Sequence, residues 1–202
     1  MPEALRIAFT GRKGGVGRTV MAVRLAEHWS KTRKIALRLN ADTGERIPPY
    51  LADLVPEPDA DLILVDTSRH DTEPPDADLL VVPVHPRLEA VVPTKAYLHE
   101  LSPELRRRTV LLPNEVRARR GAKAGPSSTS QEAAFLVELA NLSEELGLQA
   151  MLPPVYNSLA ISSSRSIAEH RNGAKTRTDI EAVGEGLERI LASGAGSERP
   201  IA

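Results

Sequence analysis

Residues 11–19 read Gly-Arg-Lys-Gly-Gly-Val-Gly-Arg-Thr and form the most informative segment of the chain. An apolar run at residues 5–10 precedes them, and a helical pattern at residues 20–30 follows. A glycine-rich loop between a buried strand and a helix is the context that a phosphate-binding loop requires. The glycines let backbone N–H groups converge on an anion, and the helix N-terminus adds a favourable dipole. The sequence therefore predicts a phosphate site at this loop.

Alternating apolar and helical segments predict the rest of the fold. Strands are expected at residues 5–10, 35–39, 62–65, 79–84, 110–112 and 150–152. Helices are expected at residues 20–30, 88–101 (broken or kinked at Pro93), 132–146, 161–170 and 178–191. Strands that are apolar on both faces and separated by helices indicate a parallel sheet. We expect a single α/β domain over residues 1–192, with a mostly parallel central sheet and helices on both faces, and a flexible tail over residues 193–202.

The composition excludes several classes of function. Hydrophobic residues make up 41% of the 202 residues and charged residues 26%, as in ordinary globular proteins. The absence of cysteine excludes a disulfide scaffold, a thiolate metal or iron–sulfur site, and a cysteine nucleophile. No apolar run reaches the roughly 20 residues that span a bilayer, and residues 1–13 do not resemble a signal peptide. A cytoplasmic protein is expected.

The order of several motifs resembles the ParA/MinD family of partition and positioning ATPases. Residues 13–19 resemble its deviant Walker A loop, KGGxGK[ST], and residues 60–67 resemble its Walker B strand, with Asp66 at the metal-side position. Asp42 matches the second aspartate of the family's D-x-D switch. Asn114 stands where an asparagine recognises adenine. The resemblance covers about residues 5–190 and implies a P-loop NTPase fold that uses ATP/ADP and Mg²⁺.

The resemblance also implies roles for individual residues. Thr19 and Asp66 would hold Mg²⁺, Asp42 would position the attacking water, and Lys13 would reach the partner's phosphates across a homodimer. The implied nucleotide-binding residues are Lys13, Gly14, Gly15, Val16, Gly17, Arg18, Thr19, Val20 and Asn114.

Three positions depart from the family pattern. Arg18 stands where the Walker lysine is expected, Val20 replaces a hydroxyl residue, and Asn40 replaces the first aspartate of the D-x-D pair. An arginine is planar and larger than a lysine, so the exchange is not conservative at a tight phosphate site. These departures affect hydrolysis more than binding, because the glycines, Thr19 and Asp66 remain. A nucleotide-binding switch or pseudo-ATPase scaffold with little hydrolysis is therefore the alternative function.

The resemblance implies a ParA-like role in the partition of a plasmid or chromosome. An ATP-dependent homodimer would bind nonspecific DNA, near the nucleoid, and a ParB-like partner would stimulate it. A basic excess at residues 87–123 follows an acidic segment at residues 53–78, and either two solvated faces or an anion-binding face explains this asymmetry. The Gly-rich end of the chain disfavours a membrane-targeting helix. The candidate DNA-phosphate contacts are Arg117, Arg119, Arg120, Lys123, Arg165, Arg171 and Lys175.

Two other relatives of this fold are less favoured. The iron–sulfur and nitrogenase-reductase relatives need thiolate ligands that this chain lacks. A ligase of the dethiobiotin-synthetase type would need substrate groups that the sequence does not reveal.

Overall fold

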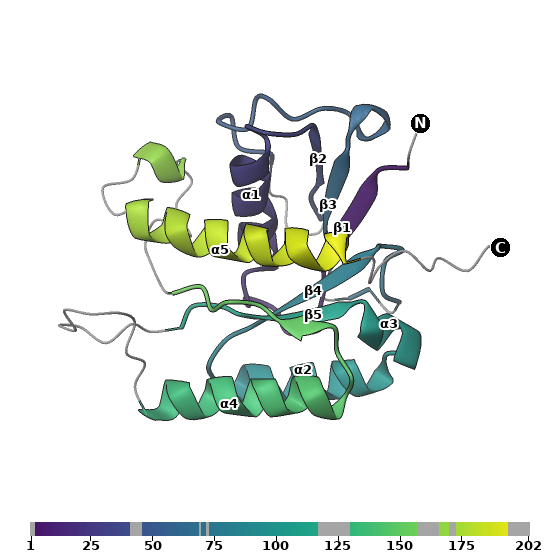
Figure 1. Ribbon diagram of the computed structural model, residues 1–202, viewed down its shortest axis with the longest axis vertical. Coiled ribbons are helices and arrows are strands. Elements are labelled where there is room, and N and C mark those ends of the chain that lie inside the picture. Colours follow the sequence, from purple (N-terminus) through teal and green to yellow (C-terminus); the bar gives the residue numbers. More distant parts are fainter. Residues whose placement is uncertain are drawn as a thin grey trace.

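A parallel six-stranded sheet, in the order β2-β3-β1-β4-β5-β6, forms the centre of the computed structural model (Figure 1). The structure describes residues 3–40, 46–68, 70–71, 73–116, 130–156, 166–169 and 173–193. Its strands are β1 (Leu5–Phe9), β2 (Ile35–Arg38), β3 (Leu62–Asp66), β4 (Leu79–Val84), β5 (Thr109–Pro113) and β6 (Ala150–Met151). Every residue of β3, β4 and β5 is buried, which explains why these segments are apolar without alternation.

Helices cover both faces of the sheet, as the sequence predicts (Figure 1). The helices are α1 (Arg18–Trp29), α2 (Leu88–Glu100), α3 (Pro103–Arg107), α4 (Ser130–Glu145) and α5 (Gly173–Ala192), with short 3₁₀ turns η2 (Glu57–Asp59) and η3 (Ile167–Glu169). On one face, Leu25 of α1 and Val183 of α5 share a core with Phe9 of β1. On the other, Leu98 of α2 and Leu139 of α4 share a core with β4 and β5.

Two helices differ from the sequence expectation. The helix expected at residues 161–170 is a three-residue turn at η3 in its described part, while α5 begins at Gly173 rather than at residue 178. The helix α2 continues through Pro93. A proline removes only its own N–H, and buried Val91 and Leu98 anchor the helix on both sides of it.

The described residues contain no helix that is both long and apolar enough to cross a membrane.

Candidate nucleotide-binding site

The glycine-rich loop connects β1 to the first turn of α1 at the carboxyl edge of the sheet. Gly15 and Gly17 have φ angles of 73° and 90°, in the left-handed region that favours glycine. Gly17 is the N-cap residue of α1, and its carbonyl accepts a hydrogen bond of 2.9 Å from the N–H of Met21. The loop therefore turns sharply into the helix and leaves the first N–H groups of α1 available to an anion.

Asn114 supports this loop from the end of β5. Its side chain is only 2% exposed, and its Nδ2 donates a hydrogen bond of 2.8 Å to the carbonyl of Val16. A Cβ atom at Gly17 would lie 2.3 Å from the same Nδ2. The amide nitrogen is thus engaged with the loop, whereas the buried Oδ1 has no hydrogen-bond partner among the described residues. The family resemblance implies that Asn114 recognises adenine; the structure adds a contact with the loop itself.

Thr19 and Asp66, which the family resemblance places together, meet at the base of the loop. The hydroxyl of Thr19 donates to Asp66 Oδ2 at 2.6 Å, because α1 begins beside the carboxyl end of β3. Asp66 is 4% exposed, and its Oδ1 has no hydrogen-bond partner within the described part of the chain. Burial raises the pKa of Asp66, while the Thr19 hydrogen bond and the charge of Arg18 oppose that rise. A hydroxyl beside a carboxylate with an unused oxygen fits the hard ligand set of Mg²⁺.

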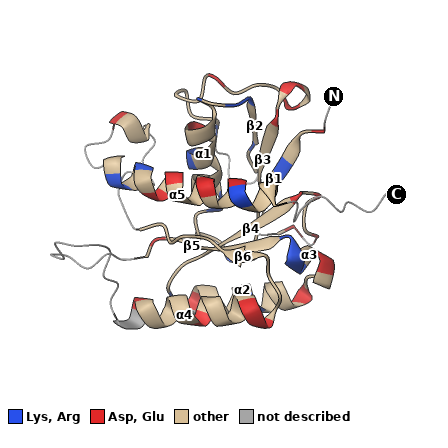
Figure 2. Cartoon of the chain, in the orientation of Figure 1, with Lys and Arg blue, Asp and Glu red and all other residues tan. Residues whose placement is uncertain are grey.

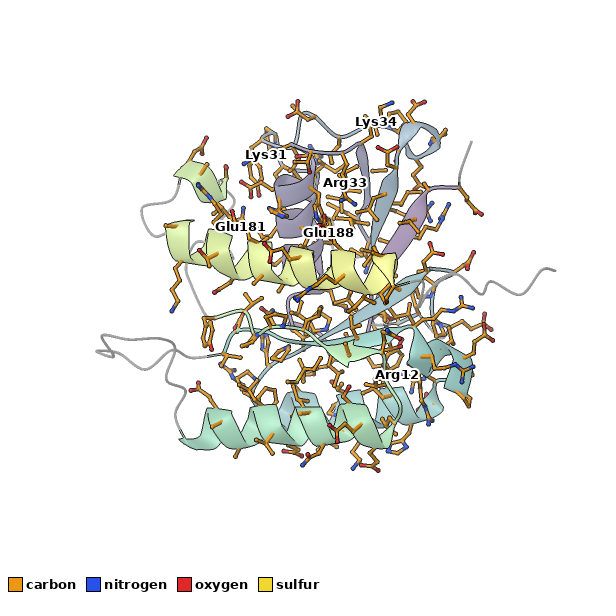
Figure 3. All side chains as sticks on the ribbon, in the orientation of Figure 1. Arg12, Lys31, Arg33, Lys34, Glu181 and Glu188 are labelled. Carbon is orange, nitrogen blue, oxygen red and sulfur yellow. The ribbon has the colours of Figure 1, made fainter. Side chains whose placement is uncertain are left out.

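The cations of the loop point in different directions. The guanidinium of Arg18 donates a hydrogen bond back to the carbonyl of Gly11. Arg12, labelled in Figure 3, is exposed and pairs with Glu100 of α2 at 2.7 Å. Lys13 is half-buried. Val20 packs against the core between α1 and α5, so its apolar side chain serves the fold.

A layer of polar residues beside the loop has no clear sequence signal. Thr10 and Tyr97 share a buried hydrogen bond of 2.9 Å. His85 Nε2 lies 3.7 Å from the Glu115 carboxylate, just beyond the ends of β4 and β5. Burial lowers the pKa of His85, and the charges of Arg87 and Lys13 act in the same direction, whereas Glu115 raises it. Thr10 and His85 directly follow β1 and β4, and only that position could have drawn attention to them; Tyr97, inside α2, has no such signal.

Several predicted site residues fall outside the described part of the chain. They are Asp42, Arg117, Arg119, Arg120, Lys123, Arg165 and Arg171. Lys175 is described: it is exposed on α5, with its Nζ 5.0 Å from the centre of the Tyr156 ring. Acidic and basic residues are interspersed along α5 (Figure 2).

Comparison with known proteins places the fold. Neither a protein-family model nor a curated protein matches the sequence. An ATP complex of McdA from Cyanothece matches 94% of this chain and 97% of its own, with a TM-score of 0.60 and 14% identity. MinD from Aquifex aeolicus matches with a TM-score of 0.62 and 14% identity, over 92% and 98% of the two chains. The chain has the fold of the ParA/MinD-type P-loop ATPases.

A plasmid partition protein from Borrelia burgdorferi bound to AMPPNP adds to this group. It has a TM-score of 0.54 and 12% identity, over 93% of this chain and 99% of its own. The ParA/MinD-type fold confirms the fold class expected from the sequence, including the single parallel sheet. Identities this low establish the fold alone, so the use of the site is argued from its residues.

Proposed function

We propose that this protein is a ParA-type ATPase that binds ATP/ADP and Mg²⁺ at the loop of residues 11–19. The observation that carries the proposal is the Thr19–Asp66 contact beneath a loop whose glycines adopt left-handed conformations. Two buried oxygens, Asp66 Oδ1 and Asn114 Oδ1, have no hydrogen-bond partner in the described structure. Leaving buried acceptors unpaired is costly, so a ligand that pairs with them is strongly favoured.

Different residues of the site bind different parts of the nucleotide. Backbone N–H groups of residues 14–19 take the phosphates, and Asn114 Oδ1 accepts from the amino group of adenine. Thr19 and Asp66 hold the metal ion, which neutralises phosphate charge when bound. Lys13 contacts the phosphates of the partner copy, and Asp42 orients water.

The same proposal extends to partners. A homodimer that forms on ATP binds nonspecific DNA, and a ParB-like protein stimulates hydrolysis and release. The cargo is a plasmid or chromosome, and the protein acts in the cytoplasm on the nucleoid. Support comes from the fold shared with a plasmid partition protein and with MinD.

Sedimentation tests dimerisation and DNA binding together. The purified protein is run with Mg²⁺ and ATP, with ADP, and without nucleotide, each with and without a nonspecific DNA duplex. With ATP, the 21.9 kDa chain is expected to sediment with twice its monomer mass and to co-sediment with DNA. Lys13→Ala is expected to stay a monomer, with Arg12→Ala as the matched control. A monomer with ATP that never binds DNA would refute the partition role.

A nucleotide-dependent switch with little hydrolysis is the second candidate function. The guanidinium of Arg18 is already bonded to the carbonyl of Gly11, so its charge is partly committed within the loop. A lysine is more compact and rotates its donors freely. Arg18→Lys separates the two functions: a large rise in ATP turnover favours the switch as the native role, and an unchanged or lower rate favours the working ATPase.

A further inference from the structure

A cavity of about 340 Å³ lies between α1, η3 and α5. Its walls come from the second half of α1 and the residues just after it, from η3, and from the first half of α5. The phosphate loop is at the opposite end of α1, so this cavity is separate from the nucleotide site. Its volume is at the small end of the range for small-molecule sites.

The floor of the cavity is a buried ion pair that is already satisfied. Arg24 is 1% exposed and donates to Glu27 at 2.8 Å and to the hydroxyl of Tyr50 at 3.1 Å. The other oxygen of Glu27 accepts from the N–H of Ile167 at 2.8 Å and from the hydroxyl of Ser166. These contacts fix η3 against α1 and leave the pair electrically neutral toward a ligand.

The rim of the cavity carries uncompensated positive charge. Lys31 and Arg177 are exposed, Glu181 is half-buried, and none of the three forms an ion pair with another described residue. Figure 3 shows Lys31 near the end of α1 and Glu181 on α5. Among the described residues that line the cavity, two cations against one carboxylate leave a surplus of one positive charge, because the floor is neutral.

Apolar side chains form part of the same wall. Ile167 and Ile180 are buried and line the cavity from η3 and α5. An apolar part of a ligand would therefore contact them, while a single negative group would match the surplus charge of the described rim.

We propose that this cavity binds a small organic acid that carries one anionic group and a short apolar arm. Lys31 and Arg177 hold the anionic group, and Ile167 and Ile180 contact the arm. A compact acid matches the volume of about 340 Å³, whereas an acidic peptide would extend well beyond it.

The test uses 3-phenylpropionate as the probe, on the full chain labelled with ¹⁵N. Amide chemical shifts are followed by NMR with and without ADP and Mg²⁺. Two partial probes serve as controls: acetate, which has the anionic group without the long apolar arm, and 3-phenylpropanol, which has the arm without the anionic group. We expect saturable shifts in α1, η3 and α5 that are unaffected by ADP, and weaker binding of both partial probes. Lys31→Gln and Arg177→Gln are each expected to weaken binding about tenfold, whereas Lys95→Gln, an exposed site on α2, leaves it unchanged.

Three results with the small probe would overturn the proposal. They are the absence of saturable shifts, shifts centred on residues 11–19 instead of the cavity, and equal affinity of the wild type and both glutamine variants. Binding of a glutamate-rich peptide in place of the small probe would also refute it, because that result assigns the rim to a protein partner.

Discussion

Replacing Gly17 with alanine tests how tightly Asn114 supports the phosphate loop. A Cβ at this position would lie 2.3 Å from Asn114 Nδ2, so the amide must move and its hydrogen bond to Val16 must break. An L-residue in the left-handed conformation costs about 1–2 kcal/mol. Leaving the buried amide of Asn114 unsatisfied costs about 1–3 kcal/mol more. Gly17→Ala is therefore expected to lower the free energy of unfolding by about 2–5 kcal/mol.

Gly15 provides a matched control in the same loop. Its φ angle is 73°, but a Cβ there would meet nothing within 4 Å. Gly15→Ala should cost only the backbone term of about 1–2 kcal/mol. Urea denaturation followed by the fluorescence of buried Trp29, the single tryptophan, measures both variants. Equal destabilisation by the two substitutions would refute the supporting role of Asn114.

A double variant isolates the contact itself. Asn114→Ala removes the amide that the new methyl group would strike. If the clash causes the loss, Gly17→Ala combined with Asn114→Ala costs less than the two single substitutions together. Strict additivity would show that Gly17 and Asn114 act independently.

Three further predictions concern buried charges. Glu27→Ala removes the carboxylate that pairs with buried Arg24 and should destabilise the protein by about 3–5 kcal/mol, whereas Glu100→Ala, at an exposed pair with Arg12, should cost about 1 kcal/mol or less. Urea denaturation at neutral pH compares the two variants. Burial lowers the pKa of His85 in the folded protein. As the pH falls below the ordinary histidine pKa of about 6.5, the unfolded chain therefore takes up a proton before the folded protein does, and the free energy of unfolding falls. His85→Gln should flatten this dependence of the free energy of unfolding on pH, and an unchanged dependence would show that His85 is not its source. Burial raises the pKa of Asp66, so Asp66→Asn should stabilise the nucleotide-free protein at neutral pH. This gain in stability should be lost below pH about 3.9. Asp66→Asn should also abolish any stabilisation by Mg²⁺ with ATP, and thermal unfolding with and without Mg²⁺ and ATP checks both effects.

The sheet could be predicted because its signals are local. Residues 79–84 are uniformly apolar and form β4 with those bounds. The pairing of Thr19 with Asp66 follows the resemblance to the family's loop and strand motifs, and the structure brings the two side chains together where α1 begins beside the carboxyl end of β3. The fold was therefore accessible from short segments and their order.

Other features depend on contacts that no local pattern records. The contact of Asn114 with the loop depends on the strand order that brings the end of β5 to this edge. The first turn of α5 lacks apolar periodicity, so its start at Gly173 was missed. Arg24 and Glu27 have the sequence pattern of a solvated helix face, yet η3 and Tyr50 enclose them.

ATP turnover by the purified protein, with and without nonspecific DNA, tests the central claim most directly. Lys13→Ala and wild type are compared at saturating ATP, with Mg²⁺ present or removed by a chelator. The account predicts Mg²⁺-dependent hydrolysis that DNA stimulates and that Lys13→Ala abolishes. ATP binding without turnover under every condition would contradict the ATPase and leave the nucleotide switch as the better description.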